Sequence, residues 1–142
     1  MIATNDIKTI LIDNVKSNAV LGLIPEIVKD QHLPVKEGSV KERIVVIVNA
    51  TDNSDWQQTY ARVCVYVPKK YLNDLGSYMP DTSRLRILER VCTELFYKRT
   101  FVEFEGKTLY YRLEDIVQED DPETWSDFLN VRLKVTNQNF KL

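Results

Sequence analysis

Histidine is nearly absent from this sequence, since its 142 residues include only His32. A zinc site built on a pair of histidines is therefore excluded. A Cys–His nucleophile would need His32, a distant cysteine and a third group that orients the imidazole. We therefore expect His32 to be a loop residue without a catalytic role.

Cysteine and glycine are also scarce, with two and four residues. Cys64 and Cys92 lack the C-x-x-C spacing of a redox or metal motif. Cys64 falls in a strand-like run and Cys92 in a helix-like run, where a buried free thiol is common; a disulfide between them stays an open alternative. None of the glycines belongs to a phosphate-binding loop, so the sequence predicts no catalytic, cofactor or metal site.

An excess of basic charge is missing as well. The formal net charge is −2 and the isoelectric point is about 5.5, so the chain as a whole lacks the positive field that binds phosphate backbones. We expect no sequence-specific nucleic-acid partner. No apolar run approaches the ~20 residues of a membrane helix. Residues 1–17 alternate polar and apolar side chains, unlike an export signal, so we expect no membrane partner.

The length suits a single domain, residues 1–142, with a sizeable core. Ile7, Ile10, Leu11 and Val15 recur at helical spacing, which predicts an amphipathic helix over residues 5–16, packed on a sheet and capped by Thr4 or Asn5. A second, stronger helix is predicted from an N-cap at 81–83 to about residue 97. Its apolar positions are Leu85, Leu88, Val91, Cys92, Leu95 and Phe96.

The β-branched and alternating runs predict a largely antiparallel sheet. Residues 43–50 are expected to form its central strand, covered on both faces and paired as a hairpin with residues 56–67. A second hairpin joins 100–105 to 108–113, and 125–136 is a half-buried strand. Four segments are expected to be irregular: an excursion at about 28–41, a connection at 69–80, an acidic surface loop at 114–123 and a flexible tail at about 137–142. The fold class is α+β, with two main helices packed on the sheet.

Two groups of residues are candidate protein interfaces. Tyr60, Arg62 and Tyr66 alternate along one strand face, and Tyr and Arg are enriched in interfaces; core packing of the tyrosines is an equal alternative. Asp120 and Asp121 lie in an acidic run with Glu119 and Glu123. This run lacks the ligand spacing of an EF-hand, so we interpret it as solvated, with attraction to a basic neighbour as its preferred role. Arg84, Arg86 and Arg90 are likewise interpreted as a solvated face.

Three segments carry a resemblance to a known family. YARVCVYVP ends a predicted strand, TSRLRILERVCTEL is the second helix, and ETWSDFLNVRLKV is the last strand. In this order, with the first helix and both hairpins, they resemble the small tail-completion or tail-terminator proteins of tailed bacteriophages. The resemblance covers most of the chain, except residues 28–41 and the C-terminal tail.

The resemblance implies a structural protein of the virion without an active site. Such proteins form a ring, commonly a hexamer, at the neck or the head-proximal end of the tail, where they stop tail-tube polymerisation and join tail to head. Their partners are neck or connector and tail-tube proteins, and assembly takes place in the host cytoplasm. In this interpretation, residues 28–41 and 114–123 contact neighbouring subunits.

Two alternatives belong to other classes. A bacterial adaptor domain would bind one protein partner through Tyr60, Arg62 and Tyr66. A metal-dependent nuclease would assemble its site from acidic residues such as Asp120 or Asp121.

Overall fold

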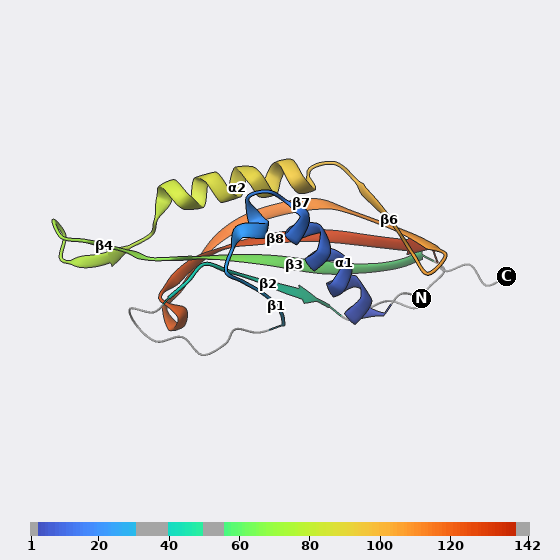
Figure 1. Cartoon of the computed structure of the whole chain (residues 1–142), viewed down its shortest axis with the longest axis horizontal. Helices are drawn as coiled ribbons and strands as arrows, with labels where there is room; N and C mark the ends of the chain where they lie inside the picture. Colours follow the sequence, from blue (N-terminus) through green and yellow to red (C-terminus); the bar gives the residue numbers. More distant parts are fainter. Residues whose placement is uncertain (1–2, 31–39, 50–55, 139–142) are drawn as a thin grey trace.

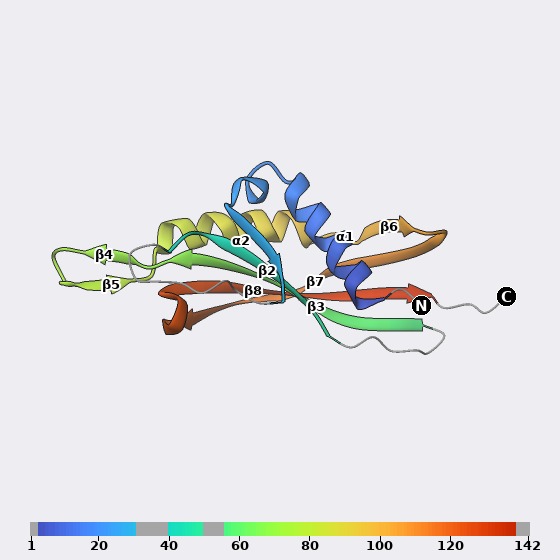
Figure 2. The same cartoon turned by 60° about the horizontal axis from the view of Figure 1, so that its bottom comes forward.

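The computed structural model of the chain describes residues 3–30, 40–49 and 56–138. A six-stranded sheet runs along the long axis of the molecule, in the order β1-β2-β3-β8-β7-β6, and both α-helices lie on one of its faces (Figures 1 and 2). Neighbouring strands are antiparallel except for β1 and β2, which are parallel. The predicted α+β class, a largely antiparallel sheet with two main helices, is confirmed.

The elements have the following bounds: α1 Thr4–Ser17, η1 Leu21–Leu23, β1 Glu26–Lys29, β2 Arg43–Val48, β3 Trp56–Pro68, β4 Lys70–Leu72, β5 Ser77–Met79, α2 Thr82–Phe96, β6 Thr100–Phe104, β7 Lys107–Asp121, η2 Pro122–Thr124 and β8 Ser126–Gln138. Strands β3, β8 and β7 are the longest, and they form the middle of the sheet.

The core lies between the helices and one face of the sheet. Alternate residues of β3 and β8, such as Val63, Val65, Val131 and Leu133, point into it and are completely buried. This is the period-two pattern that the sequence predicted for both strands. Removing these side chains from water is the main favourable contribution to folding.

The two helices cover different parts of this face. Helix α1 packs mainly on β2, and α2 packs on β7, β8 and β3. The predicted apolar face of α1 is buried, but its predicted side-chain cap is wrong, because the N-cap is Ala3 and makes no such bond. For α2, the Asp81 carboxylate accepts a hydrogen bond from the Arg84 amide, which confirms the predicted N-cap.

Strand β2 is correctly predicted as a strand buried on both faces, but not as the central one. Val46 faces the helices, and Val45 packs on the opposite face with Cys64 and Tyr66. Strand β1 pairs with the outer edge of β2, in a stretch that the sequence placed partly in the 28–41 excursion. Residues 31–39 of that excursion lie outside the described residues.

Two predicted irregular segments are regular. Residues 70–79 form a separate two-stranded sheet, β4–β5, instead of an irregular connection. The expected acidic loop is the second half of β7, which pairs with β8 as far as Asp121. The start of the expected flexible tail, Asn137 and Gln138, belongs to β8, and residues 139–142 lie outside the described part of the chain.

A β-bulge explains why the second half of β7 was missed. The register with β8 shifts between Leu113 and Asp115, so Glu114 is an extra residue. Before the bulge Leu109, Tyr111 and Leu113 lie toward the core, whereas after it Ile116 does. The change from odd to even positions interrupts the alternation that identifies a strand in sequence.

Candidate protein-interaction site

The β4–β5 hairpin, residues 70–79, projects past the end of the six-stranded sheet as a narrow arm (Figures 1 and 2). Tyr71 and Tyr78 are cross-strand partners whose ring centroids lie 5.1 Å apart. Gly76, at φ 61°, closes the turn in a backbone conformation that glycine adopts without strain. We call residues 70–79 the arm.

Every residue of the arm is exposed, including large apolar ones. Of the twelve large hydrophobic residues that are exposed in the described part of the chain, six belong to the arm or to the adjoining turn before β8: Tyr71, Leu72, Leu75, Tyr78, Met79 and Trp125. Within this group the Tyr78 and Trp125 rings are 6.3 Å apart. Apolar side chains gathered at one projecting end make the arm a candidate interaction site.

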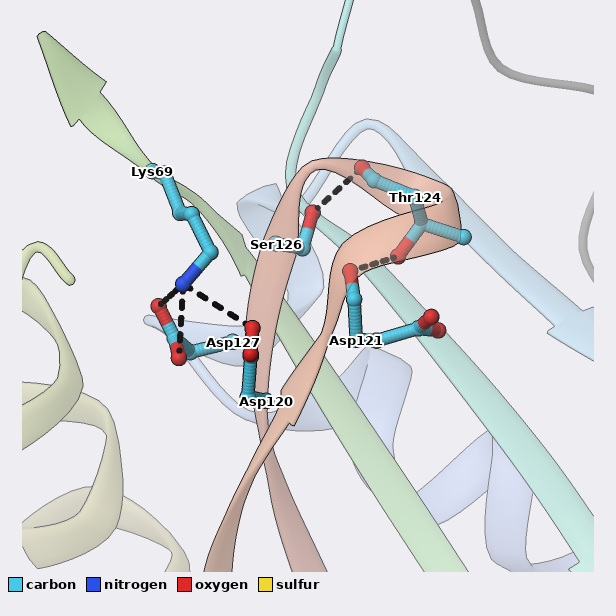
Figure 3. A network of polar contacts seen from close by, with 6 residues as sticks. All are labelled: Lys69, Asp120, Asp121, Thr124, Ser126 and Asp127. Carbon is cyan, nitrogen blue, oxygen red and sulfur yellow. Dashed lines mark hydrogen bonds and ion pairs between the residues drawn. The ribbon is translucent and has the colours of Figure 1, made fainter. Parts of the chain in front are cut away.

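Lys69 anchors the base of the arm. Its amide donates to the Trp125 carbonyl at 2.9 Å, and its Nζ lies 3.0 Å from Asp120 Oδ1 and 3.1 Å from Asp127 Oδ2 (Figure 3). Partial burial opposes its charge, but the hydrogen bonds with Asp120 and Asp127 outweigh this effect and raise the pKa of Lys69. The arm is therefore tied to the ends of β7 and β8 by a charged cluster.

The turn between β7 and β8 places further acidic groups beside the arm. Thr124 Oγ1 donates to the Asp121 carbonyl at 3.4 Å, and Ser126 Oγ donates to the Thr124 carbonyl at 2.9 Å (Figure 3). These bonds shape η2 and leave the Glu123 side chain exposed. We call residues 119–123 the acidic end.

Asp120 and Asp121, predicted together as interface residues, lie on opposite faces of β7. Asp120 joins the Lys69 cluster on the helix side, and the Asp121 carboxylate points away from Lys69 (Figure 3). The Glu119 carboxylate accepts a hydrogen bond from the side-chain Nδ2 of Asn130 at 3.1 Å. The acidic run is thus partly used within the fold, and Asp121 and Glu123 have no ion pair among the residues that the structure describes.

The three residues predicted on β3 lie on the sheet face opposite the helices, which we call the open face, but they have different environments. Tyr60 is 47% exposed and Arg62 is partly exposed. Tyr66 is buried and stacks on Phe128, with centroids 4.7 Å apart and 22° between the rings. Burial raises the pKa of Tyr66, as expected for a phenol removed from water. Only Tyr60 and Arg62 are therefore available to a partner.

Arg84, interpreted from the sequence as part of a solvated face, makes an ion pair with Glu42. Arg84 Nε and Nη2 donate to Glu42 at 2.7 and 2.9 Å, which raises the pKa of Arg84. Both cysteines are buried and free.

Within the described ranges, no group of three His, Cys, Asp or Glu residues is arranged to hold a metal ion, and no helix is long and apolar enough to cross a membrane. His32 lies outside the described residues.

Sequence reasoning missed the arm. Pro68 and Pro80 bracket it, and Asn73-Asp74-Leu75-Gly76 is a recognisable turn. The strands flanking this turn have three residues each, too few for alternation to be read.

No family model and no curated protein matches the sequence of this chain.

Proposed function

We propose that this chain is a non-enzymatic structural subunit that assembles with copies of itself into a closed ring. As the resemblance to tail-completion and tail-terminator proteins implies, the ring belongs to the neck or head-proximal end of a bacteriophage tail. There it ends the tail tube and joins the tail to the head. The observation that carries the self-assembly is the projecting arm with its exposed apolar side chains.

The arm needs a partner for physical reasons. A two-stranded hairpin without a third strand or a covering helix is marginally stable in water. Among the described residues its two strands pair only with each other, and its large side chains are exposed. Contact with a neighbouring subunit would bury Tyr71, Leu75 and Tyr78 and order the hairpin at the same time.

A ring follows if the arm binds a different surface of the next copy. Such a heterologous contact repeats from subunit to subunit and closes when the rotation permits. The arm extends from one end of an elongated molecule, which suits contact with a neighbour rather than with its own sheet (Figure 1).

The position in a phage tail rests on the resemblance. The segments that carry it correspond to the end of β3, to α2 and to β8 with its preceding turn. The arm connects the first two of these segments, so the proposed contact element belongs to the same arrangement.

The experiment compares the wild type with Leu72→Glu/Leu75→Glu in sedimentation velocity and negative-stain microscopy. Two charges in the contact should weaken assembly by at least about 30-fold, which corresponds to about 2 kcal/mol. Leu23→Glu is the matched control, because Leu23 is 82% exposed but lies in η1, away from the arm. We expect rings for the wild type and the control, and monomers for the arm variant.

Rings that persist in the arm variant would contradict the role of the arm. A wild-type dimer closed by twofold symmetry would contradict the ring itself and would favour the adaptor alternative.

A further inference from the structure

The open face carries a basic and aromatic surface at the end of the sheet away from the arm. This surface carries four cations, Arg62, Arg99, Arg112 and Lys134, and three aromatic residues, Tyr60, Tyr110 and Phe101. These residues come from β3, β8, β7, β6 and the segment before β6. We call this set the basic patch.

Strand register brings the patch together. Tyr60 is paired with Lys134, and Lys134 with Arg112, so these three form one row across β3, β8 and β7. In the next row Tyr110 pairs with Phe101, and their ring centroids are 5.5 Å apart. The Arg99 guanidinium lies 5.1 Å from the centre of the Tyr110 ring.

The surface is hollowed between these rows. Gln58, Arg99, Tyr110, Arg112, Lys134 and Thr136 line a depression of about 150 Å³. Aromatic and Arg side chains around a depression are typical of the centre of a protein interface.

Among the residues that the structure describes, the four cations of the patch (Arg62, Arg99, Arg112 and Lys134) make no ion pair. The neighbouring Arg132 is bound by Asp115, which lowers the pKa of that carboxyl group through their hydrogen bonds. Glu103 and Glu114 are the other acidic side chains of β6 and β7 near this end of the sheet.

The opposite end of the same sheet has the complementary character. The acidic end contributes Glu119, Asp120, Asp121 and Glu123, of which Lys69 neutralises only Asp120 by an ion pair. The aromatic arm and Trp125 lie beside it. The acidic end and the basic patch thus lie in different halves of β7, in the directions of opposite ends of the sheet.

We infer that the basic patch is the surface that receives the acidic end and the arm of the next copy. This inference deepens the proposed ring and rests on it. Tyr60, Phe101 and Tyr110 offer apolar area to the arm, while Arg62, Arg112 and Lys134 face Asp121 and Glu123 of the neighbour. Electrostatic complementarity of this kind fixes the register and orientation of an interface.

A second copy fits the patch better than a nucleic acid does. The chain has a net charge of −2, and its acidic end would repel a strand laid along the sheet. The four cations are also fewer than the roughly 6–10 phosphate contacts of a typical DNA-binding protein.

Charge reversal in two variants tests the inference. The patch variant is Arg112→Glu/Lys134→Glu, and the end variant is Asp121→Lys/Glu123→Lys. Each variant alone should assemble at least about 30-fold more weakly than the wild type, because like charges then meet across the contact. An equimolar mixture should regain assembly, since each variant then offers the charge that the other needs. Arg86→Glu/Arg90→Glu, which reverses exposed cations of α2, is the matched control and should assemble normally.

Sedimentation velocity of these samples gives a decision in every case. Recovery in the mixture supports the inference, and it also excludes misfolding as the cause of the loss. If the arm variant loses assembly while the patch variant keeps it, the proposed ring stands and this inference falls. A mixture that stays monomeric overturns the inference, and a wild type that never assembles overturns the ring together with it. Binding of a single-stranded oligonucleotide by the wild type, lost in the patch variant while assembly is unchanged, would also overturn it.

Discussion

Lys69 joins three segments of the chain with one side chain. Its ammonium group lies between Asp120 of β7 and Asp127 of β8, and its backbone amide binds the turn before β8. The Asp127 side chain is only 4% exposed, so removal of Lys69 would leave a buried carboxylate without this ion-pair partner. Because Lys69 directly precedes the arm, the same contacts set the direction in which the arm leaves the sheet.

Replacement of this lysine should destabilise the fold. In Lys69→Met two carboxylates face each other without a cation, one of them buried. We expect the free energy of unfolding to fall by about 2–4 kcal/mol. This loss is somewhat smaller than the usual loss of about 3–5 kcal/mol on breaking a fully buried pair, because Asp120 is largely exposed. Urea unfolding measures this loss. Lys70→Met, at the exposed neighbouring position, should change the free energy by less than about 0.5 kcal/mol; an equal loss there would argue against the cluster.

The buried thiols predict a pH dependence. Burial raises the pKa of Cys64 to about 11 and that of Cys92 to about 12, from 9.0. Between pH 9.0 and about 11, both thiols therefore stay neutral in the folded state but ionise in the unfolded state. Their contribution to stability is complete below pH 9.0 and is lost as the pH rises through the folded values.

Two measurements test the predicted loss of stability at high pH and the burial of the thiols that causes it. The free energy of unfolding should fall between pH 9 and pH 11, and less steeply in Cys64→Ala/Cys92→Ala. At pH 8, a thiol reagent should modify the folded chain at least about 100-fold more slowly than the chain in denaturant. Rapid labelling of the native protein would contradict the burial of the cysteines.

At the scale of elements, the N-cap of α2 is the clearest sequence signal. The Asp81 side chain accepts from the Arg84 amide, an otherwise unsatisfied donor of the first turn. Asp81→Ala should therefore cost about 1 kcal/mol in thermal or urea unfolding. Asp81→Asn keeps an acceptor and should cost little, so equal losses in both variants would contradict the capping role.

Elements in which apolar residues recur at a regular spacing over their whole length were predictable from the sequence, and the others were not. The β3 alternation and the Leu85, Leu88, Cys92 and Phe96 spacing of α2 have the expected buried faces. The acidic half of β7 could not be recognised, because the bulge at Glu114 shifts the period and an open sheet face tolerates charged residues.

The candidate site was predictable only in part. Tyr60 and Arg62 were correctly placed on one strand face, but the burial of Tyr66 depends on Phe128, which is 62 positions away in sequence. The separation of Asp120 from Asp121 follows from the strand that the sequence did not reveal. The basic patch joins β3, β6, β7 and β8, and only the strand order brings their side chains together.

At the scale of the whole molecule, the sheet is long and its two ends carry different surfaces. The arm lies at one extremity (Figures 1 and 2), the acidic end is in the second half of β7, and Tyr110 and Arg112 of the basic patch are in the first half. A subunit with two unlike, complementary ends is suited to a heterologous contact. The small net charge of −2 therefore does not exclude two oppositely charged surfaces on one molecule.

Assembly into a ring can be measured as the solution mass of the unmodified protein, by light scattering across a concentration series. The mass should rise from the 16.6 kDa monomer to a fixed limit of several subunits, because a closed ring has no free end to extend. A mass that stays at one subunit up to about 1 mM, where even a contact of about 4 kcal/mol would be half occupied, would contradict it.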